Sequence, residues 1–370
     1  MSDHLANQSG LFAMLRELAE LAGVSGAEAP VRDYLARTLQ EHVDELQVDA
    51  LGNLIAIKRG NGRDRMKVAV MAHMDEVGLI VSGADESGQL KFRVTGGIEP
   101  HALLAKRVRV GSEQLPGVIG YKPVHLQSRQ EREKEVDLQE LRVDIGAKDE
   151  KEALAKAPLG TAINFETKVH FAGTAPDKLP AGDRLPEKGR LIGKAFDDRL
   201  GCLALAALLR GPRLPYDLYG IFTIQEEVGL RGARVAAWGV EPDLAVVLET
   251  TFADDLPSEE DKSPTTRLGR GPAITVMDRT VITDPRLVRY FLSKAAAAGI
   301  PAQIKQPGVG GTDAGAVQSA HGGVPVAVLS VPSRYIHSPV SLMDLEDLNN
   351  LLRLLAVAIP DLQQLGKGIA

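Results

Sequence analysis

The stretch KVAVMAHMDEVGLIV, residues 67–81, decides the fold of this chain. Its first apolar run ends in two polar side chains, His73 and Asp75, which predicts a buried strand with functional groups at its carboxyl end. Because one residue separates them, both side chains leave the same face of an extended segment. His73 can then bind a metal while Asp75 accepts the other ring N–H and fixes the tautomer. The segment therefore predicts the first part of a metal site.

The same arrangement recurs along the chain. The apolar runs LYGIFTI, LAVVL and AVLSV are each followed by residues that are good metal ligands. Strand carboxyl ends meet at one edge of a parallel sheet, so groups that are distant in sequence converge there. The candidates in these and one further segment are Asp197 in KAFDDRLG, Glu226 and Glu227 in IQEEVGLRGA, Glu249 in VVLET, and His337 in PSRYIHSP.

These residues suit a hydrolase that uses two metal ions. One carboxylate can bridge two cations with its two oxygens, and we assign this task to Asp197. Neighbouring residues on an extended chain point in different directions, so one of Glu226 and Glu227 should bind metal and the other should act as general base. Glu249 and His337 would each supply one further ligand. Two imidazoles and three carboxylates suit two divalent ions such as Zn²⁺, Co²⁺ or Mn²⁺ without selecting among them.

Composition limits the class of protein. The chain has 370 residues, 44% of them hydrophobic and 25% charged, which is ordinary for a globular protein with two domains. Its net charge of -6 argues against binding to nucleic acid or to an anionic membrane, because both need a basic face. No signal pattern and no apolar run of about 20 residues occurs, which predicts a cytoplasmic protein. Cys202 is the only cysteine, so a thiolate zinc site is excluded.

The texture of the chain changes twice. Residues 1–76 and 175–370 alternate strand and helix patterns, which predicts an α/β domain with a mixed, largely parallel sheet flanked by helices. Residues 77–174 consist of short alternating segments broken by glycines, which is typical of a small all-β domain. We therefore expect a discontinuous catalytic domain that carries an inserted β-rich domain. The runs NLIAIKRG and MKVAVMAHMD predict two neighbouring strands.

Three other segments are expected to be structural. The charged tract at 128–140 predicts a solvated loop or an exposed helix. The acidic cluster Glu259, Glu260 and Asp261 stands among turn formers and predicts a surface loop. The apolar neighbours of Cys202 in CLALAALL predict a buried helical thiol.

Five motifs, in order along the chain, carry a resemblance to a known family. AHMDEVGLIV, KAFDDRLG, QEEVGLRGA, GGTDAGA and SRYIHSP resemble those of the tetrahedral (TET-type) metalloaminopeptidases, which are often described as glutamyl aminopeptidase-like or cellulase-like. The resemblance implies a zinc-peptidase-like α/β domain with two metal ions and an inserted PDZ-like β domain. It also implies that the insert mediates dimerisation and that dimers build a hollow dodecamer.

The resemblance also implies a role for each site residue. Metal ligands would be Asp197 as the bridge, His73 and Glu249 on one ion, and Glu227 and His337 on the other. Glu226 would be the general base, and Asp75 would orient His73. Many members of the family carry Asp where this chain has Glu249, and the extra methylene puts the metal preference in doubt. Thr312 and Asp313, in the glycine-rich GGTDAGA segment at 310–316, are expected on the substrate side.

An aminopeptidase is therefore the leading hypothesis, and three alternatives remain open. A metal-dependent amidohydrolase or deacylase could use the same catalytic set on N-acylated amino acids. A glycosidase could use paired carboxylates, but it would leave His73, Asp75 and His337 unexplained. A non-catalytic assembly protein could keep metal for folding alone, and loss of Glu226 would then change nothing.

Overall fold

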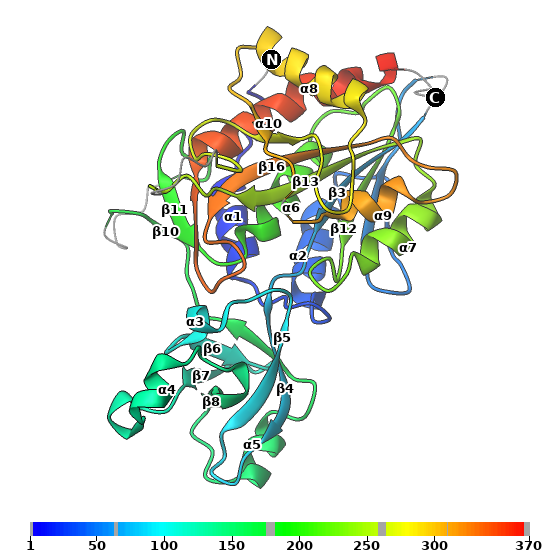
Figure 1. Cartoon of the computed structure of the whole chain (residues 1–370). Helices are drawn as coiled ribbons and strands as arrows, with labels where there is room; N and C mark the ends of the chain where they lie inside the picture. The colour runs from blue at the N-terminus through cyan, green and yellow to red at the C-terminus, as the bar shows by residue number, and fades with distance from the viewer. Residues whose placement is uncertain (1–2, 63–65, 175–181, 258–263, 309, 366–370) are drawn as a thin grey trace.

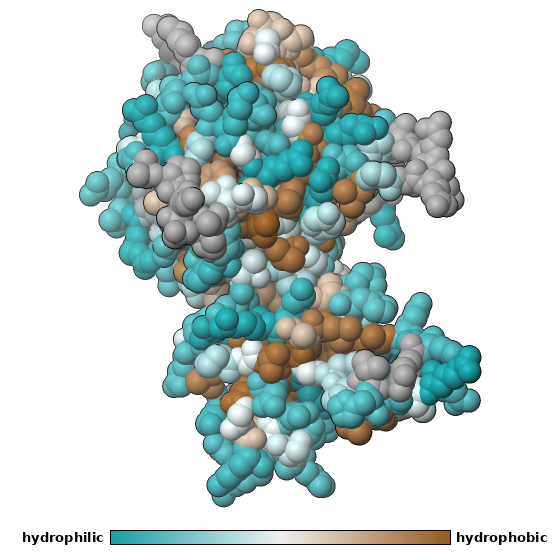
Figure 2. All heavy atoms as spheres, turned by 90° about the vertical axis from the view of Figure 1, so that its left-hand side faces the viewer, coloured by the Kyte–Doolittle hydropathy of each residue, from teal (hydrophilic) through white to brown (hydrophobic). Residues whose placement is uncertain are grey.

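The computed structural model describes residues 3–62, 66–174, 182–257, 264–308 and 310–365. The predicted loop at Glu259, Glu260 and Asp261 lies outside these residues. The chain forms a large α/β unit and a smaller β unit that are joined by a narrow waist (Figures 1 and 2). Among the described helices, none has the length and apolar character that a bilayer crossing requires.

An 11-stranded sheet forms the centre of the α/β unit. Along the sheet the strand order is β1-β2-β12-β3-β13-β16-β17-β11-β10, and β14 joins β15 to β16. The strands are β1 (Glu45–Val48), β2 (Leu54–Lys58), β3 (Lys67–His73), β10 (His170–Phe171), β11 (Arg190–Gly193), β12 (Asp217–Thr223), β13 (Leu244–Phe252), β14 (Ala273–Thr275), β15 (Gln303–Lys305), β16 (Val326–Arg334) and β17 (Ser341–Asp344).

The four central strands of this sheet are parallel. In their register Thr223 of β12 lies beside His73 of β3, and Glu249 of β13 lies beside Ser330 of β16. Both flanks pair antiparallel. The predicted mixed sheet is confirmed, but its parallel part is smaller than expected and comprises only the centre and the β14–β15 pair. The prediction that β2 and β3 are neighbours is wrong, because β12 lies between them.

Helices cover both faces of the sheet. Five of them share one buried core with it, and two share a second core on the opposite face. The first set is α1 (Leu11–Glu20), α2 (Ala29–Leu39), α6 (Phe196–Leu209), α8 (Pro285–Ala297) and α10 (Leu345–Ala358); the second is α7 (Arg231–Val240) and α9 (Asp313–Gln318). Figure 1 shows α8 and α10 above the sheet and α7 beside α9.

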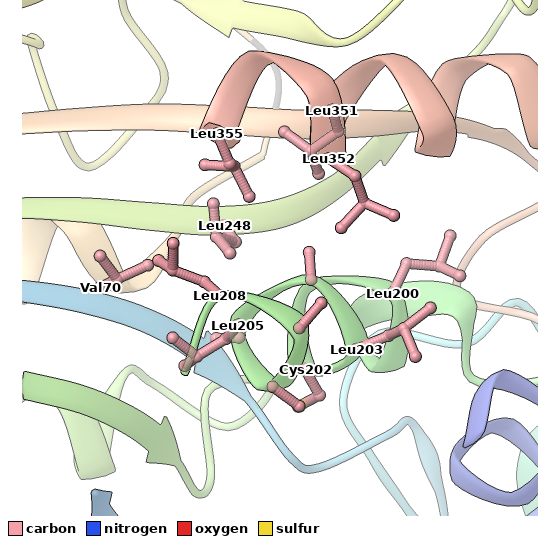
Figure 3. Packing of buried hydrophobic residues seen from close by; sticks show 14 of the residues in the cluster. Val70, Leu200, Cys202, Leu203, Leu205, Leu208, Leu248, Leu351, Leu352 and Leu355 are labelled. Carbon is pink, nitrogen blue, oxygen red and sulfur yellow. The ribbon is translucent and has the colours of Figure 1, made fainter. Parts of the chain in front are cut away.

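Helix α6 is the most deeply buried of these helices. Its sequence FDDRLGCLALAALL is apolar on all sides after its first turn, and such a helix must be enclosed. Leu205 and Leu208 lie near Val70 and Leu248 of the sheet, and α10 packs over them (Figure 3). The expected burial of Cys202 in this helix is confirmed. Burial fixes α6 firmly, and its first turn carries Asp197.

Six strands close into a barrel that forms the smaller unit. They follow the order β4-β5-β8-β7-β6-β9 and enclose their own apolar core. These strands are β4 (Gly78–Ala84), β5 (Leu90–Thr95), β6 (Arg107–Val110), β7 (Leu115–Gly120), β8 (Arg142–Asp144) and β9 (Ala162–Phe165). The predicted small all-β domain is confirmed as a separate barrel. Strand β10, although it falls within 77–174, pairs with β11 of the large sheet.

The barrel unit also contains short helices between its strands. They are α3 (Pro100–Leu103), α4 (Arg129–Glu133) and α5 (Glu150–Lys156). The charged tract at 128–140 begins with α4, and the Arg129 side chain is exposed, as predicted. Asp149 begins α5, and its carboxylate accepts the amide N–H of Glu152 at 2.8 Å.

The barrel meets the α/β unit beside the carboxyl end of β3. Asn164 accepts a hydrogen bond from the Gly23 amide at 3.1 Å, and Thr167 donates to the Pro339 carbonyl at 2.8 Å. The backbone at Gly96, with φ +81°, passes so close that a Cβ there would lie 2.7 Å from a methyl of Val77. Only glycine fits this position without strain. A loop of the barrel therefore reaches the edge where the predicted ligands gather.

Candidate metal centre

Three of the predicted ligands meet where the end of β3, the carboxyl half of β13 and the first turn of α6 come together. His73 Nε2 lies 3.2 Å from Asp197 Oδ1 and 3.3 Å from Glu249 Oε1. Both His73 and Glu249 are buried, and donor atoms of the three residues all lie within 4.8 Å of one another. This spacing allows one ion to contact all three.

A second group shares one residue with the first. His337 Nε2 lies 3.4 Å from Asp197 Oδ2 and 3.5 Å from Glu227 Oε2, and these three also form a cluster within 4.8 Å. Asp197 thus presents a different oxygen to each group. The structure brings together all five residues that were predicted as ligands.

Local backbone conformation aims these side chains. Ala195, Gln225 and His337 all have left-handed φ angles, of 53°, 53° and 56°. Residues with a Cβ rarely adopt this conformation, and such positions cluster at functional sites. The turn at Gln225 follows β12 directly, and it leads to Glu227 in the second group while Glu226 belongs to neither.

Asp75 is completely buried and has more partners than the sequence indicates. Its backbone carbonyl lies 3.1 Å from His73 Nδ1, and its carboxylate Oδ1 lies 3.4 Å from the same nitrogen. The carboxylate also accepts hydrogen bonds from the Ser25 hydroxyl at 2.7 Å and from the amides of Glu226 and Glu227 at 3.0 and 3.2 Å. Asp75 therefore holds both His73 and the turn that carries the two glutamates.

The remaining predicted residues lie around the two groups. Burial raises the pKa of Glu226 well above its ordinary value, and the charges of Glu249 and Asp313 add to the effect. Thr312 and Asp313 are 2% and 1% exposed. The Thr312 hydroxyl donates to Asp278 at 3.2 Å, and Asp313 accepts from the Thr223 hydroxyl at 2.5 Å. Both residues therefore have partners inside the protein.

The site concentrates negative charge away from water. Burial raises the pKa of Glu227 to about 8 and that of Glu249 to about 7. Burial lowers the pKa of His337, but Asp197 and Glu227 outweigh it and raise that pKa to about 9. Burial disfavours ionised Asp197, yet His337 and His73 hold its pKa well below the usual range. These raised pKa values favour bound protons on Glu227, Glu249 and His337, and a divalent cation would displace those protons on binding.

The donor set fits divalent cations. Every candidate donor is an imidazole nitrogen or a carboxylate oxygen, and such donors suit ions of the zinc, cobalt and manganese kind. Glu249 Oε2 is buried and has no hydrogen-bond partner within the described residues. A buried carboxylate oxygen without a partner is costly, and a cation would satisfy it.

Sequence reasoning missed several residues that support the site. Glu76 and Lys194 form a buried ion pair beside it. Ser25 donates a hydrogen bond to Asp75, and Gly96 closely approaches Glu227. Glu76 stands inside the first quoted motif, so a charged residue beside an apolar run was a usable signal. Ser25 and Gly96 lie outside every motif, and nothing in their local sequence marks them.

A protein family model described as M42 glutamyl aminopeptidase matches residues 52–354. The chain belongs to this family. M42 membership makes it a hydrolase of peptide bonds, and the predicted resemblance to TET-type aminopeptidases is confirmed by the relatives below.

This M42 chain is similar to the lysyl aminopeptidase of Pyrococcus furiosus, with 34% identity over 357 residues that cover 95% of this chain and 97% of that protein. Among solved structures, a TET aminopeptidase from a marine sediment archaeon of the Thaumarchaeota gives a TM-score of 0.87 at 35% identity, covering 95% and 96% of the two chains. The TET1 peptidase of Pyrococcus horikoshii, which can assemble into a tetrahedron or a large octahedral shell, gives 0.79 at 32% identity, covering 94% and 99%.

Proposed function

We propose that this chain is a metal-dependent aminopeptidase that removes N-terminal residues from peptides. The observation that carries the proposal is Asp197, whose two carboxylate oxygens lie in different ligand groups. Asp197 would bridge two divalent ions, with His73 and Glu249 completing one site and Glu227 and His337 the other. The family match and the relative described as a lysyl aminopeptidase support the reaction class.

Glu226 is proposed as the general base. Two bound divalent ions would supply polarisation of the scissile carbonyl and a lowered pKa for the attacking water. Glu226 directly precedes the proposed ligand Glu227 but belongs to neither group, so its carboxylate would be available to take the proton and pass it to the leaving amine. Its backbone is held by Asp75, which also contacts His73 and thereby links the base to the first ligand group.

Metal identity and substrate contacts are finer parts of the proposal. Zn²⁺, Co²⁺ and Mn²⁺ all suit the donor set, and Glu249 reaches one methylene further than an aspartate would. Thr312 and Asp313 are proposed to support the substrate side of the site indirectly, without touching the substrate. Asp313 would do so through Thr223, which ends β12 just before the turn that carries Glu226.

The proposal extends to self-association through the barrel. The barrel unit exposes three large hydrophobic residues, Val118, Leu126 and Leu159, at 43%, 60% and 67%. Hydrophobic patches are visible on the barrel in Figure 2. Because the similar Pyrococcus horikoshii peptidase forms closed shells, we expect dimers of this chain to build a dodecamer.

The domain division also stays a proposal. We propose that 77–174 is a PDZ-like insert and that 1–76 and 175–370 form the catalytic domain. The six barrel strands lie within the proposed insert, and β10 near its end pairs with the catalytic sheet. A cytoplasmic location remains a prediction from the sequence.

Substitution of the proposed base tests the function. Glu226→Gln should retain bound metal and assembly but lower peptide turnover by about 10² to 10⁴. Glu41→Gln, at an exposed position, is the matched control and should retain wild-type turnover. Wild-type turnover by the Glu226→Gln enzyme would remove the base from the mechanism and favour a non-catalytic assembly protein.

A substrate panel tests the choice of reaction. Free-amine aminoacyl amides, including lysyl and glutamyl ones, should be cleaved, and N-acylated amino acids should not. Chelation of metal should abolish the activity and re-addition should restore it. Preference for the blocked substrates would favour the deacylase, and cellulose hydrolysis that survives chelation would favour the glycosidase.

A further inference from the structure

Three buried charged side chains lie beside the proposed metal centre, where Glu76 lines one pocket with Asp197, Glu227 and His337. Glu76, Lys194 and Arg199, here called the clamp, are 2%, 2% and 1% exposed. Lys194 Nζ donates to both carboxylate oxygens of Glu76 at 2.7 Å, and Arg199 Nη2 donates to one of them at 3.2 Å. In the sequence, Glu76 follows Asp75, while Lys194 and Arg199 flank Asp197.

The two cations of the clamp also donate hydrogen bonds to backbone carbonyls. Arg199 Nε donates to Met74 at 2.8 Å, and its terminal nitrogens donate to carbonyls of the segment that ends α1, at Leu18, Leu21 and Gly23. Lys194 Nζ donates to the Leu21 carbonyl at 2.9 Å. The clamp therefore joins three chain segments that are far apart in sequence: the end of α1, the end of β3 and the start of α6.

The clamp contacts both sequence neighbours of Asp75. Arg199 holds the carbonyl of Met74 and the side chain of Glu76, which are the two neighbours of Asp75. Asp75 in turn accepts from the amides of Glu226 and Glu227. Hydrogen bonds, together with the backbone of residues 74–76, thus connect the helix that carries Asp197 to the turn that carries the proposed base.

Stability alone does not account for such an arrangement. Taking charges out of water is expensive, and buried ion pairs can often be replaced by apolar residues without loss of stability. Buried ion pairs do, however, fix geometry, because each partner must meet the other at a defined distance and direction. In this chain the fixed distance is the one between the His73–Asp75 segment and the Asp197 turn.

We propose that Glu76, Lys194 and Arg199 are positioning residues that set the separation of the two ligand-bearing segments and, through Asp75, the placement of Glu226. The inference rests on the proposed function for its consequence in catalysis. Its structural part, the ordering of the turn at Glu226 by the clamp, does not need metal. Groups behind metal ligands commonly change metal affinity or activity by about 10- to 100-fold when altered.

Two variants separate positioning from stability. Lys194→Met leaves Glu76 with a weakened set of partners and should destabilise the protein. The double variant Glu76→Met with Lys194→Met removes this ion pair and leaves Arg199 with its backbone carbonyl partners, so it should recover part of the lost stability. Both variants should nevertheless bind Zn²⁺ about 10- to 100-fold more weakly in equilibrium dialysis and show a lower kcat at similar KM. Lys168→Met, which breaks the exposed pair with Glu20, is the matched control.

Hydrogen exchange supplies a readout that needs neither metal nor substrate. In the metal-free full-length double variant, amides at 226–227 should exchange faster than in the wild type, while barrel amides keep their wild-type rates. Wild-type exchange at 226–227 in a folded double variant would overturn the clamp, whatever the enzyme hydrolyses. Wild-type protein that binds no divalent ion would instead count against the proposed function, and the exchange result would still decide the inference.

Discussion

Replacement of Asp75 by asparagine tests how the site is held together. Asparagine has the same shape, but one of its two terminal atoms becomes an NH₂ group that cannot accept. If the NH₂ takes the place of Oδ1, the Glu226 amide loses its acceptor, and His73 Nδ1 keeps only the backbone carbonyl of residue 75. If it takes the place of Oδ2, only the Glu227 amide is left without one, because the Ser25 hydroxyl can turn and accept.

The second orientation is cheaper and fixes the expected magnitude. One buried N–H without an acceptor costs about 1 to 3 kcal/mol, so the free energy of unfolding of the metal-free protein should fall by that amount. Loss of the negative charge beside His73 should also weaken Zn²⁺ binding about 10- to 100-fold. Urea denaturation and equilibrium dialysis measure the two effects separately.

The matched control is Asp144→Asn in a barrel turn, where the carboxylate accepts the Gly146 amide at 2.8 Å in an exposed setting. That variant should stay within about 0.5 kcal/mol of wild type and bind Zn²⁺ normally. Unchanged stability together with unchanged Zn²⁺ affinity in Asp75→Asn would refute the reasoning, because the carboxylate would then hold neither the glutamate turn nor the imidazole.

Other predictions concern the barrel loop, acid stability and the core. Gly96→Ala places a Cβ at a left-handed position 3.2 Å from Glu227 Oε2. It should lower the free energy of unfolding by about 1 to 3 kcal/mol and weaken binding of the ion that Glu227 would hold. Full Zn²⁺ stoichiometry at wild-type affinity would contradict this. The hydrogen bond from Arg213 lowers the pKa of Asp44 to about 2. Asp44→Asn should therefore be less stable than the wild type at pH 6, and this difference in the free energy of unfolding, measured by urea titration, should vanish as pH falls from about 4 to 2. Leu205→Ala should lower the free energy of unfolding by about 2 to 5 kcal/mol in urea, and a change below about 1 kcal/mol would show that the core collapses around it.

The ligand positions on strands could be predicted because one local pattern encodes two facts. An apolar run such as VAVMA predicts a buried strand, and a polar residue directly after the run predicts a functional group toward its carboxyl end. His73 ends β3 and Glu249 lies in the carboxyl half of β13, and the structure places them 3.3 Å apart. Asp197 and His337 stand in turns, so their residue types and the family resemblance, rather than periodicity, pointed to them.

Contacts that join distant segments could not be predicted from local pattern. β12 inserts between β2 and β3 because its pairing with β3 is set by long-range packing, which a turn signal between neighbouring runs cannot reveal. The pair Lys194–Glu76 joins residues 118 positions apart. Gly96 approaches Glu227 only because the assembled barrel packs against the edge of the sheet. Each of these depends on the assembled fold.

The chain leaves the large sheet at His73 and enters the barrel at Gly78, so residues 74–77 both link the two units and carry Asp75, which contacts His73 and the glutamate turn. A force on the barrel, such as one from packing subunits into the proposed shell, would therefore be transmitted to the backbone at Asp75. A chimera that exchanges the barrel for that of a relative should keep this link together with the glycine at 96, because both lie against the candidate metal centre.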